Sequence, residues 1–383
     1  MAKIYRVRWG FKSNPAHRKF VAERLKGLKE GLKADVHATT SEHSLRLATW
    51  NLMHFGNSGS YDRTEESMLY IAEIIDHFDL VAVQEVNRNL AKLDELVGKY
   101  LGDGWDYVVS DTAGKPTGDG TTDDGNNERL AFLYRTGKVR FRKEVGEIVL
   151  PVGRGIQIAG ENGALSEVQF ARTPFSVSFE AGWLKFKLVT VHIYYGDSSD
   201  SSAKMRRRKD EIGAIAKFLA ERQEYERRMG EEMAREAKWV KPEEGGWDAN
   251  YLLLGDFNIV SPEHGTMQRL VEAGFEAATS STTDLGDKHH YDQVAVKSAH
   301  PHFRVLNSDS FDMLKYVYRD EDAGHYVDVA KIPKLTENGR SGEKAETYFK
   351  RYYRRHQMSD HKLLWCEICI DYSNEYLDAI VGE

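Results

Sequence analysis

The sequence predicts one large domain built from buried β-strands and charged, amphipathic helices. Two observations carry this prediction: several apolar runs have the length of core strands, and the charged stretches between and around them show helical spacing. The chain has 383 residues, of which 41% are hydrophobic, and no Pro/Ser-rich linker divides it. We therefore expect a single large core with additions rather than a string of small domains.

The predicted core strands share a feature, because a polar residue follows or interrupts each apolar run. One polar group at the mouth of a turn is ordinary, but the same arrangement at five strand ends indicates a common role. In chain order, the five sites are residues 45–50 before Asn51, 79–83 before Gln84-Glu85, 188–191 before His192, 251–254 before Gly255-Asp256, and 357–359 before Asp360-His361.

The most informative of these sites is the tetrapeptide Gly255-Asp256-Phe257-Asn258. Side chains alternate across a strand, so Asp256 and Asn258 are expected on one face while Phe257 points into the core. That face then holds a proton acceptor next to a group that both donates and accepts hydrogen bonds. Gly-Asp is also a common turn sequence, so the tetrapeptide gains its meaning from the other strand ends.

Together these residues resemble the endonuclease/exonuclease/phosphatase superfamily, and within it the branch similar to deoxyribonuclease I. The resemblance covers about residues 45–371. It implies an α+β fold, a four-layered sandwich of two packed mixed β-sheets flanked by helices, with the active site at one end. The motifs are Thr49-Trp50-Asn51, Gln84-Glu85-Val86, Glu128-Arg129, Val191-His192, Gly255-Asp256-Phe257-Asn258, Tyr291-Asp292 and Ser359-Asp360-His361.

The resemblance also implies a divalent metal, with Mg²⁺ expected and Mn²⁺ as a substitute. Glu85 and Asn51 would hold the ion, and Asp360 would be a carboxylate on the metal side. Carboxylate and amide oxygens are hard ligands that suit magnesium better than zinc. The sequence shows no cluster of thiolate or histidine ligands that would favour zinc.

Catalytic and phosphate-binding roles follow from the same resemblance. A phosphodiester gains negative charge during attack on phosphorus, so positive groups and proton donors are needed beside it. A histidine with an acidic partner suits this work, because the carboxylate fixes the tautomer and raises the pKa of the ring. The implied roles are His361 with Asp292, His192 with Glu128, Asp256 and Asn258 to position nucleophile and phosphate, and Arg172 to contact phosphate.

Four of these residues also have a purely structural interpretation, and the first is Asp292, which is compatible with the start of a strand before Gln293-Val294-Ala295-Val296. His192 is compatible with a hydrogen-bonded core histidine, and Glu128-Arg129 with a surface ion pair of little energetic value. Arg172 precedes Thr173-Pro174 and is also compatible with an edge-strand residue that the proline restrains.

Segments outside the resemblance are expected to be additions to the core. The predicted boundaries are a basic N-terminal extension over residues 1–44, the endonuclease/exonuclease/phosphatase domain over residues 45–375, and a C-terminal tail over residues 376–383. The domain carries insertions at about residues 201–247 and 312–356. Residues 201–238 predict one long charged helix or two, and the Gly/Thr/Asp-rich residues 114–127 predict a loop beside the active site.

The sequence has no apolar stretch of the kind found in a secretory signal or a membrane span, so we expect a cytoplasmic protein without membrane contact. Its only cysteines, Cys366 and Cys369, lie at an odd offset within a probable strand, which argues against a redox or zinc pair. Secreted nucleases of the resembled family often carry disulfides, and their absence here weakens an extracellular interpretation.

The substrate is less well determined. A net charge of −7 does not favour a protein coated in positive potential, although local basic patches can guide nucleic acid. The best patch is residues 348–356, where aromatic rings would stack on bases or, alternatively, fill the core behind an amphipathic helix. Deoxyribonuclease I reads the minor groove through an arginine and a tyrosine, whereas this chain has Asn87 and Asn126 there, with Arg88 next to the first.

Three functions are compatible with these observations. The first is a metal-dependent phosphodiesterase, an endonuclease that hydrolyses DNA or RNA. The second is a phosphatase or phosphodiesterase that acts on a phospholipid, an inositol phosphate or a small nucleotide. The third is a catalytically silent nucleic-acid-binding module, which is disfavoured because every matched catalytic position holds a chemically competent residue. Fold alone does not separate the first two.

Overall fold

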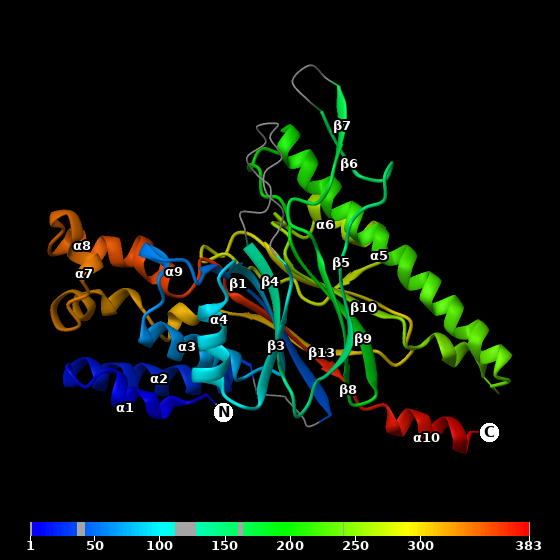
Figure 1. The fold of residues 1–383 in the computed structure, drawn as a ribbon, viewed down its shortest axis with the longest axis horizontal. Helices are drawn as coiled ribbons and strands as arrows, with labels where there is room; N and C mark the ends of the chain where they lie inside the picture. The colour runs from blue at the N-terminus through cyan, green and yellow to red at the C-terminus, as the bar shows by residue number, and fades with distance from the viewer. Residues whose placement is uncertain (1, 37–42, 112–127, 160–163, 240, 383) are drawn as a thin grey trace.

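In the computed structural model, two six-stranded mixed β-sheets pack face to face and helices cover both outer faces (Figure 1). The structure describes residues 2–36, 43–111, 128–159, 164–239 and 241–382. The prediction of a four-layered α/β sandwich is confirmed. The loop predicted over residues 114–127, with Asn126, lies outside the described residues.

The strands of the two sheets come from all parts of the chain. The first sheet has the order β13 (Val305–Phe311), β14 (Leu363–Cys369), β1 (Ser44–Phe55), β2 (Leu80–Asn87), β4 (Glu128–Arg135) and β3 (Trp105–Val109). The second sheet has the order β11 (Glu276–Ala277), β12 (Asp292–Ser298), β10 (Asn250–Asp256), β9 (Leu184–His192), β8 (Phe175–Ala181) and β5 (Arg140–Glu147). A separate hairpin consists of β6 (Ile156–Ala159) and β7 (Leu165–Val168).

Alternation along the strands decides which residues lie between the sheets. In β1, Leu45 and Leu47 pack between the sheets, whereas Ala48 and Trp50 pack against the helices of the outer face. In β10, Leu252 and Leu254 lie between the sheets. Side chains alternate along a strand, so Asn51 lies on the inward face of β1 with Leu45 and Leu47. Asp256 likewise lies on the inward face of β10, and both side chains point into the layer between the sheets.

The outer face of the second sheet is covered by α5 (Ala203–Glu236) and α6 (Gly265–Glu272). Residues 201–238 thus contain one long helix, whose first half buries Ile212, Ile215 and Leu219. Its second half extends past the sheet and packs on the short 3₁₀ helix Pro242–Gly246 (Figure 1). The approach is close because both contacts are glycines: a Cβ on Gly230 would lie 2.1 Å from the carbonyl oxygen of Gly245.

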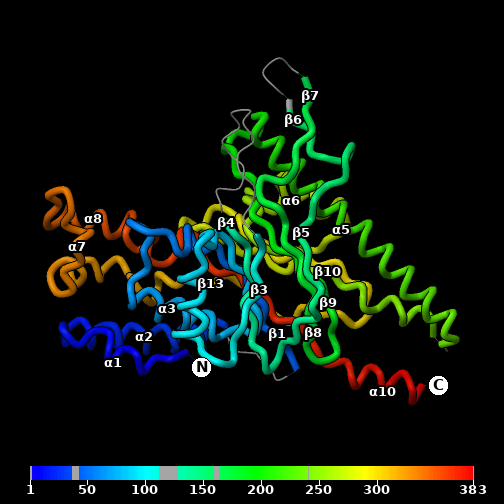
Figure 2. The backbone as a smooth tube through the Cα atoms, viewed as in Figure 1, coloured from blue at the N-terminus to red at the C-terminus, as the bar shows by residue number. Residues whose placement is uncertain are grey.

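The outer face of the first sheet is covered by a layer that we call the helical lobe, defined as residues 2–36 and 313–357 together with α3 (Glu65–Ile75). Figure 2 shows the N-terminal helices in blue beside the orange helices of the later segment. Their apolar side chains form one cluster, in which Leu25 and Leu28 pack with Tyr326 and Phe349. The remaining helices here are α1 (Val7–Gly10), α2 (Pro15–Asp35), α7 (Pro333–Thr336), α8 (Glu343–Tyr348) and α9 (Arg354–Gln357).

Two further helices complete the fold: α4 (Ala91–Glu95) follows β2, and α10 (Ser373–Val381) follows β14. Cys366 and Cys369 are both buried free thiols. In the described part of the chain, none of the helices combines the length and the apolar character that a bilayer crossing requires. The predicted domain boundaries remain predictions.

Candidate active site

The strand ends of both sheets meet at one end of the inter-sheet layer, where the apolar core gives way to buried polar groups. This place brings together all the predicted site residues except Asp360, each linked to another by a hydrogen bond or ion pair. They are Asn51, Glu85 and Glu128 from the first sheet, His192, Asp256 and Asp292 from the second, and Arg172, Asn258 and His361 from adjoining loops.

Asp256 lies at the centre of the site and is 2% exposed. Its Oδ2 accepts a hydrogen bond from Asn51 Nδ2 at 3.2 Å. The same oxygen is 3.6 Å from His192 Nε2 and 3.7 Å from His361 Nε2. Two imidazole rings and one amide therefore converge on a single carboxylate oxygen.

Glu85 reaches the site through an irregularity in its strand. The pairing of β2 with β4 shifts register between Val83 and Val86, and Glu85 has a φ of +59°. Regular alternation would send Glu85 to the same outer face as Val83, so the bulge redirects the side chain. Its Oε1 then accepts from Asn51 Nδ2 at 2.9 Å, and its Oε2 accepts from the backbone N–H of His54 at 2.8 Å.

His361 is held from behind by Asp292, whose Oδ2 is 2.7 Å from His361 Nδ1. Both side chains are buried. Burial alone would lower the pKa of His361, but the negative charges of Asp292 and Asp256 raise it well above the ordinary value. These charges favour the protonated ring, which presents its Nε2 to the interior of the site.

His192 has the corresponding arrangement on the other side of Asp256. Its Nδ1 is 2.9 Å from Glu128 Oε2, and Arg172 Nε donates to Glu128 Oε1 at 2.6 Å. Burial opposes the charge on Glu128, but His192 and Arg172 outweigh it and lower the pKa of this carboxyl to about 2. The pKa of His192 is raised, because Glu128 and Asp256 outweigh burial and Arg172.

Glu128 and Arg129 do not form the surface pair that the sequence left open. Glu128 turns inward to His192, whereas Arg129 bonds to the backbone oxygen of Ser110 at 2.6 Å. Arg172 binds Glu128, so it is more than a restrained edge residue. Its guanidinium still carries hydrogen atoms that this bond does not use.

Backbone geometry explains why Gly255 precedes Asp256. Gly255 has a φ of +132°, and a Cβ there would lie 2.1 Å from the carbonyl oxygen of Val191. Asn258 also has a positive φ, of +54°, and its N–H donates to Asp256 Oδ1 at 3.0 Å. Its Nδ2 donates to the oxygen of Ile193 at 2.9 Å, which joins the turn after β10 to the end of β9. In this structure Asn258 therefore braces the site.

Several supporting residues were not assigned a role from the sequence. Gln84 donates to Thr190 Oγ1 at 2.9 Å and so links the two sheets one layer below the site. Ser359 donates to the oxygen of Asn51 at 2.5 Å and accepts from the N–H of His361 at 2.9 Å. Their positions inside the motifs Gln84-Glu85 and Ser359-Asp360-His361 were the available signal.

Two buried arginines, Arg63 and Arg208, also support the site but belong to none of the sequence motifs. Arg208 of α5 donates to the oxygen of Asn258 at 3.0 Å and to that of Tyr195 at 2.8 Å. Arg63 donates to the oxygen of Met53 at 2.9 Å and to that of Met358 at 3.2 Å. Burial lowers the pKa of Arg63 to about 10 despite nearby acidic groups. Both side chains hold loops of the site by their backbone oxygens.

The donor set fits a hard divalent cation. Glu85 and Asp256 direct carboxylate oxygens at the same amide nitrogen of Asn51, so negative charge is concentrated there. The two histidines have acidic partners at Nδ1, which leaves oxygen donors as the ligands best suited to Mg²⁺. The Asn51 oxygen accepts from the N–H of Met53 at 2.9 Å, so coordination through this oxygen requires rotation of the amide.

Asp360 has a different position from the other predicted metal ligands. It is half-buried, and its charge acts on Arg63 and His361. Two groups of candidate ligands have their donor atoms within 4.8 Å of one another, namely Glu85 with Glu128 and His192, and Asp256 with Asp292 and His361. Asp360 belongs to neither group of described residues, so its role as a ligand remains a prediction.

Several solved structures are similar to the chain at low sequence identity. The mannosyl-6-phosphatase Bt3783 of Bacteroides thetaiotaomicron VPI-5482 is 16% identical, with a TM-score of 0.46, over 85% of this chain and 99% of that one. TDP2 of D. rerio, complexed with single strand DNA product, is 13% identical, with a TM-score of 0.46 and the same coverages. The human Nocturnin catalytic domain with bound sulfate anion is 13% identical, with a TM-score of 0.45, over 86% and 96%.

No curated relative matches the chain. The profile of the Endonuclease/Exonuclease/phosphatase family, however, matches residues 48–288, which is more than half of the sequence. This stretch includes the strand ends that carry Asn51, Glu85, Glu128, His192 and Asp256. The chain therefore belongs to the endonuclease/exonuclease/phosphatase family.

Proposed function

We propose that this protein is a magnesium-dependent phosphodiesterase, an endonuclease that hydrolyses DNA or RNA. Members of its family hydrolyse phosphate esters. The observation that carries the proposal is the convergence of two histidine–carboxylate pairs on Asp256, beside the Glu85–Asn51 pair. This arrangement supplies a proton acceptor between two cationic donors, as displacement at a charged phosphate requires.

Geometry and charge together suggest how the residues share the work: the Nε2 atoms of both histidines face Asp256, and the raised pKa values favour the protonated rings. An imidazolium binds a phosphate oxygen or donates a proton, but it does not accept one. His361 and His192 therefore orient and neutralise the phosphate, and one of them protonates the leaving oxygen. Asp256 is left as the acceptor of the proton from the attacking water.

Glu85 and Asn51 would hold the magnesium ion, with Asp256 facing the same position. When bound, the cation supplies positive charge that stabilises the phosphate oxygens during displacement. Arg172 adds a fixed positive charge next to His192, because its guanidinium is anchored by Glu128.

A nucleic acid is favoured over a small phosphate ester because cationic and aromatic side chains lie beside the site. Arg351 and Arg355 are exposed on the segment that leads to His361, and Tyr352 is 51% exposed there. Phosphates and bases together would engage such a surface, whereas a small monoester would not extend to it.

The test is magnesium-dependent turnover of a substrate panel, with Glu85→Gln as the matched control. The panel contains duplex DNA, single-stranded DNA, RNA, an inositol phosphate, sphingomyelin, a cyclic dinucleotide and the chromogenic diester bis(p-nitrophenyl) phosphate. We expect cleavage of nucleic acid and of the chromogenic diester, abolished by a chelator, restored by Mg²⁺ or Mn²⁺, and lost in Glu85→Gln.

Turnover of small phosphate esters alone would assign the same residues to a phosphatase or phosphodiesterase of small substrates. Absence of all turnover, with nucleic acid still bound, would indicate the silent binding module and overturn the proposal.

A further inference from the structure

Aromatic rings lie in two adjacent groups, and the first group begins at the metal-side residue Glu85. His54 Nδ1 is 3.3 Å from Glu85 Oε2, and its side chain is 43% exposed. The His54 ring meets the Tyr61 ring at a centroid distance of 4.6 Å, and Tyr61 meets His356 at 4.7 Å. The first group thus passes from the end of β1 to helix α9 in two steps.

The second group lies along one face of the helical segment 348–357. Tyr352 lies four residues before His356, so the two share a helix face. Tyr352 meets Tyr348 at a centroid distance of 5.5 Å, and the Arg340 guanidinium lies 3.9 Å from the centre of the Tyr348 ring. We call the five rings His54, Tyr61, His356, Tyr352 and Tyr348 the aromatic track.

The track is separate from the hydrophobic core of the same helical segment. Phe349 and Tyr353 are buried, at 0% and 3% exposure, and pack inside the helical lobe. Tyr352 is 51% exposed, and Tyr348 and His356 are half-buried. The core interpretation of residues 348–356 therefore holds for one face of the segment, whereas the other face leaves its rings accessible.

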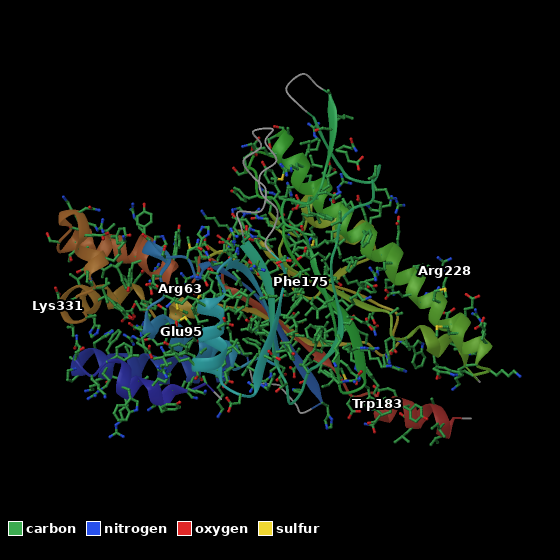
Figure 3. The ribbon with its side chains drawn as sticks, in the orientation of Figure 1. Arg63, Glu95, Phe175, Trp183, Arg228 and Lys331 are labelled. Carbon is green, nitrogen blue, oxygen red and sulfur yellow. The ribbon has the colours of Figure 1, made fainter. Side chains whose placement is uncertain are left out.

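Arg63 fixes the two halves of the track relative to each other. Its guanidinium is buried and donates to the backbone oxygens of Tyr61, Met53 and His356. One side chain thus ties the backbone at Tyr61 to the end of β1 that carries His54 and to helix α9 at His356. Figure 3 shows Arg63 between the helical lobe and the sandwich. Such bracing holds the rings in place before a ligand arrives.

The charges along the track change with distance from the site. Asp62 and Asp360 accompany its first part, and Lys92 lies 3.5 Å from Asp62. Farther along, Arg351 and Arg355 are exposed, whereas Arg354 is occupied by Asp320 at 2.6 Å. Cations available for phosphates therefore lie beside the outer rings, where a strand leaving the site would pass.

We propose that the aromatic track binds a single strand of nucleic acid that extends from the active site, with bases on the rings and phosphates at Arg351 and Arg355. Accessible rings stack on unpaired bases, which a duplex does not offer. The inference rests on the proposed function, because the strand must enter the site to be cleaved. DNA and RNA share the required chemistry, and the experiment separates them.

The test measures binding of labelled oligonucleotides of about a dozen nucleotides, a typical length for a stacking groove. All proteins carry Asp256→Asn, so that no strand is consumed. The ligands are single-stranded DNA, RNA, duplex DNA and an abasic strand with the same phosphates. We expect the single strands to bind about tenfold or more tightly than the abasic strand, as stacking on several rings predicts.

Tyr352→Ala should weaken binding of the single strands about tenfold, and Tyr352→Phe should restore it. Arg351→Gln with Arg355→Gln should weaken all ligands and reduce the salt dependence of binding. The matched control is Tyr225→Ala with Arg228→Gln on α5: Tyr225 is 58% exposed, and Arg228 lies across the view from the helical lobe (Figure 3). The control should bind like the parent.

Equal affinity for the normal and abasic strands would overturn the aromatic track, as would tighter binding of the duplex. So would equal losses in Tyr352→Ala and the α5 control. Turnover of bis(p-nitrophenyl) phosphate by the wild-type protein distinguishes this failure from failure of the proposed function. If the diester is hydrolysed but the abasic strand binds as well as the normal one, only the track is refuted.

Discussion

Two buried clusters in this protein combine histidine with carboxylate, and they differ in how fully their hydrogen bonds are used. In the helical lobe, Glu66 accepts from Tyr70 at 2.8 Å and from Tyr326 at 2.6 Å, and its other oxygen is 3.3 Å from His17. His17 in turn lies 3.1 Å from His325. Each side chain points at a partner within hydrogen-bonding distance.

In the active site, the contacts at the Nδ1 atoms of the two histidines are shorter than the contacts at their Nε2 atoms. Asp292 and Glu128 approach the Nδ1 atoms at 2.7 and 2.9 Å, but the Nε2 atoms stop 3.7 and 3.6 Å from Asp256. Glu85 and Asn258 also keep positive φ values, which cost conformational energy. The cluster in the helical lobe is therefore completed by its own side chains, whereas the active site leaves polar atoms directed at a common point.

The largest expected effect is the loss of activity in His361→Asn. The asparagine amide retains a donor near Nδ1 for Asp292 but removes Nε2, so kcat/KM should fall by about 1,000-fold or more. Stability should fall far less than activity, because the asparagine amide still donates a hydrogen bond to the buried carboxylate. Steady-state kinetics and urea denaturation measure the two quantities. A loss of stability in proportion to the loss of activity would mean that His361 serves the fold, as the lobe cluster does, rather than the chemistry.

The lobe cluster should show the opposite behaviour in Glu66→Ala. Two tyrosine hydroxyls and His17 lose their buried acceptor, which should lower the free energy of unfolding by about 3 kcal/mol. Urea denaturation measures the change, with the exposed Glu23→Ala of α2 as the control, expected within about 0.5 kcal/mol. The folded Glu66→Ala protein should keep its kcat. A large drop in kcat would mean that the lobe takes part in the chemistry.

A smaller effect is expected on the pH dependence of Glu128→Gln. The proposed mechanism needs His192 as an imidazolium, so kcat/KM falls as pH rises through its pKa. The charge of Glu128 raises that pKa, and its removal should move the alkaline limb to lower pH. A pH–rate profile measures the shift. An unchanged limb would show that His192 is not the group that titrates.

Glu128→Gln also tests stability, and here the expected change lies at acidic rather than alkaline pH. The pKa of Glu128 is lowered to about 2 in the folded protein, from an ordinary 4.5. Its stabilising contribution is therefore present above the unfolded value and is lost as pH falls toward the folded one. The stability advantage of the wild type over Glu128→Gln should shrink in acid. An advantage that grows on acidification would contradict the pairing.

The smallest effect is expected on α5, in Arg228→Ala. Arg228 is 65% exposed and lies 3.5 Å from Glu224, one helical turn away. Exposed pairs of this kind contribute little, so unfolding should change by less than about 0.5 kcal/mol and activity should not change. Denaturation and turnover measured side by side check this. A substantial loss of activity would place this helix near the substrate, in contrast to the helical lobe.

Strand alternation accounts for much of the site that the sequence could predict. Asn51, His192 and Asp256 continue the inward-facing positions of apolar strands, so their meeting between the sheets follows from periodicity once the sheets pack. Glu85 breaks that periodicity through its bulge, and only its motif marked it in advance. Arg63 and Arg208 bind backbone oxygens, which no sequence pattern reports.

The additions to the core show the same limit. Local spacing predicts one charged helix or two over residues 201–238, and an amphipathic helix is one of two interpretations of residues 348–356. That residues 2–36 and 313–357 share one cluster depends on side chains such as Leu25 and Tyr326, about 300 positions apart in the chain. Local periodicity says nothing about such a contact.

The strands, their polar ends and the family to which they belong are visible in the sequence, because these depend on local alternation and short motifs. Tertiary structure alone decided that Asp256 would lie between two imidazoles, that Glu85 would turn inward, and that rings from residues 54, 61 and 356 would meet. The physical reason is that distances between side chains from remote segments are fixed by sheet packing and by buried hydrogen bonds to the backbone.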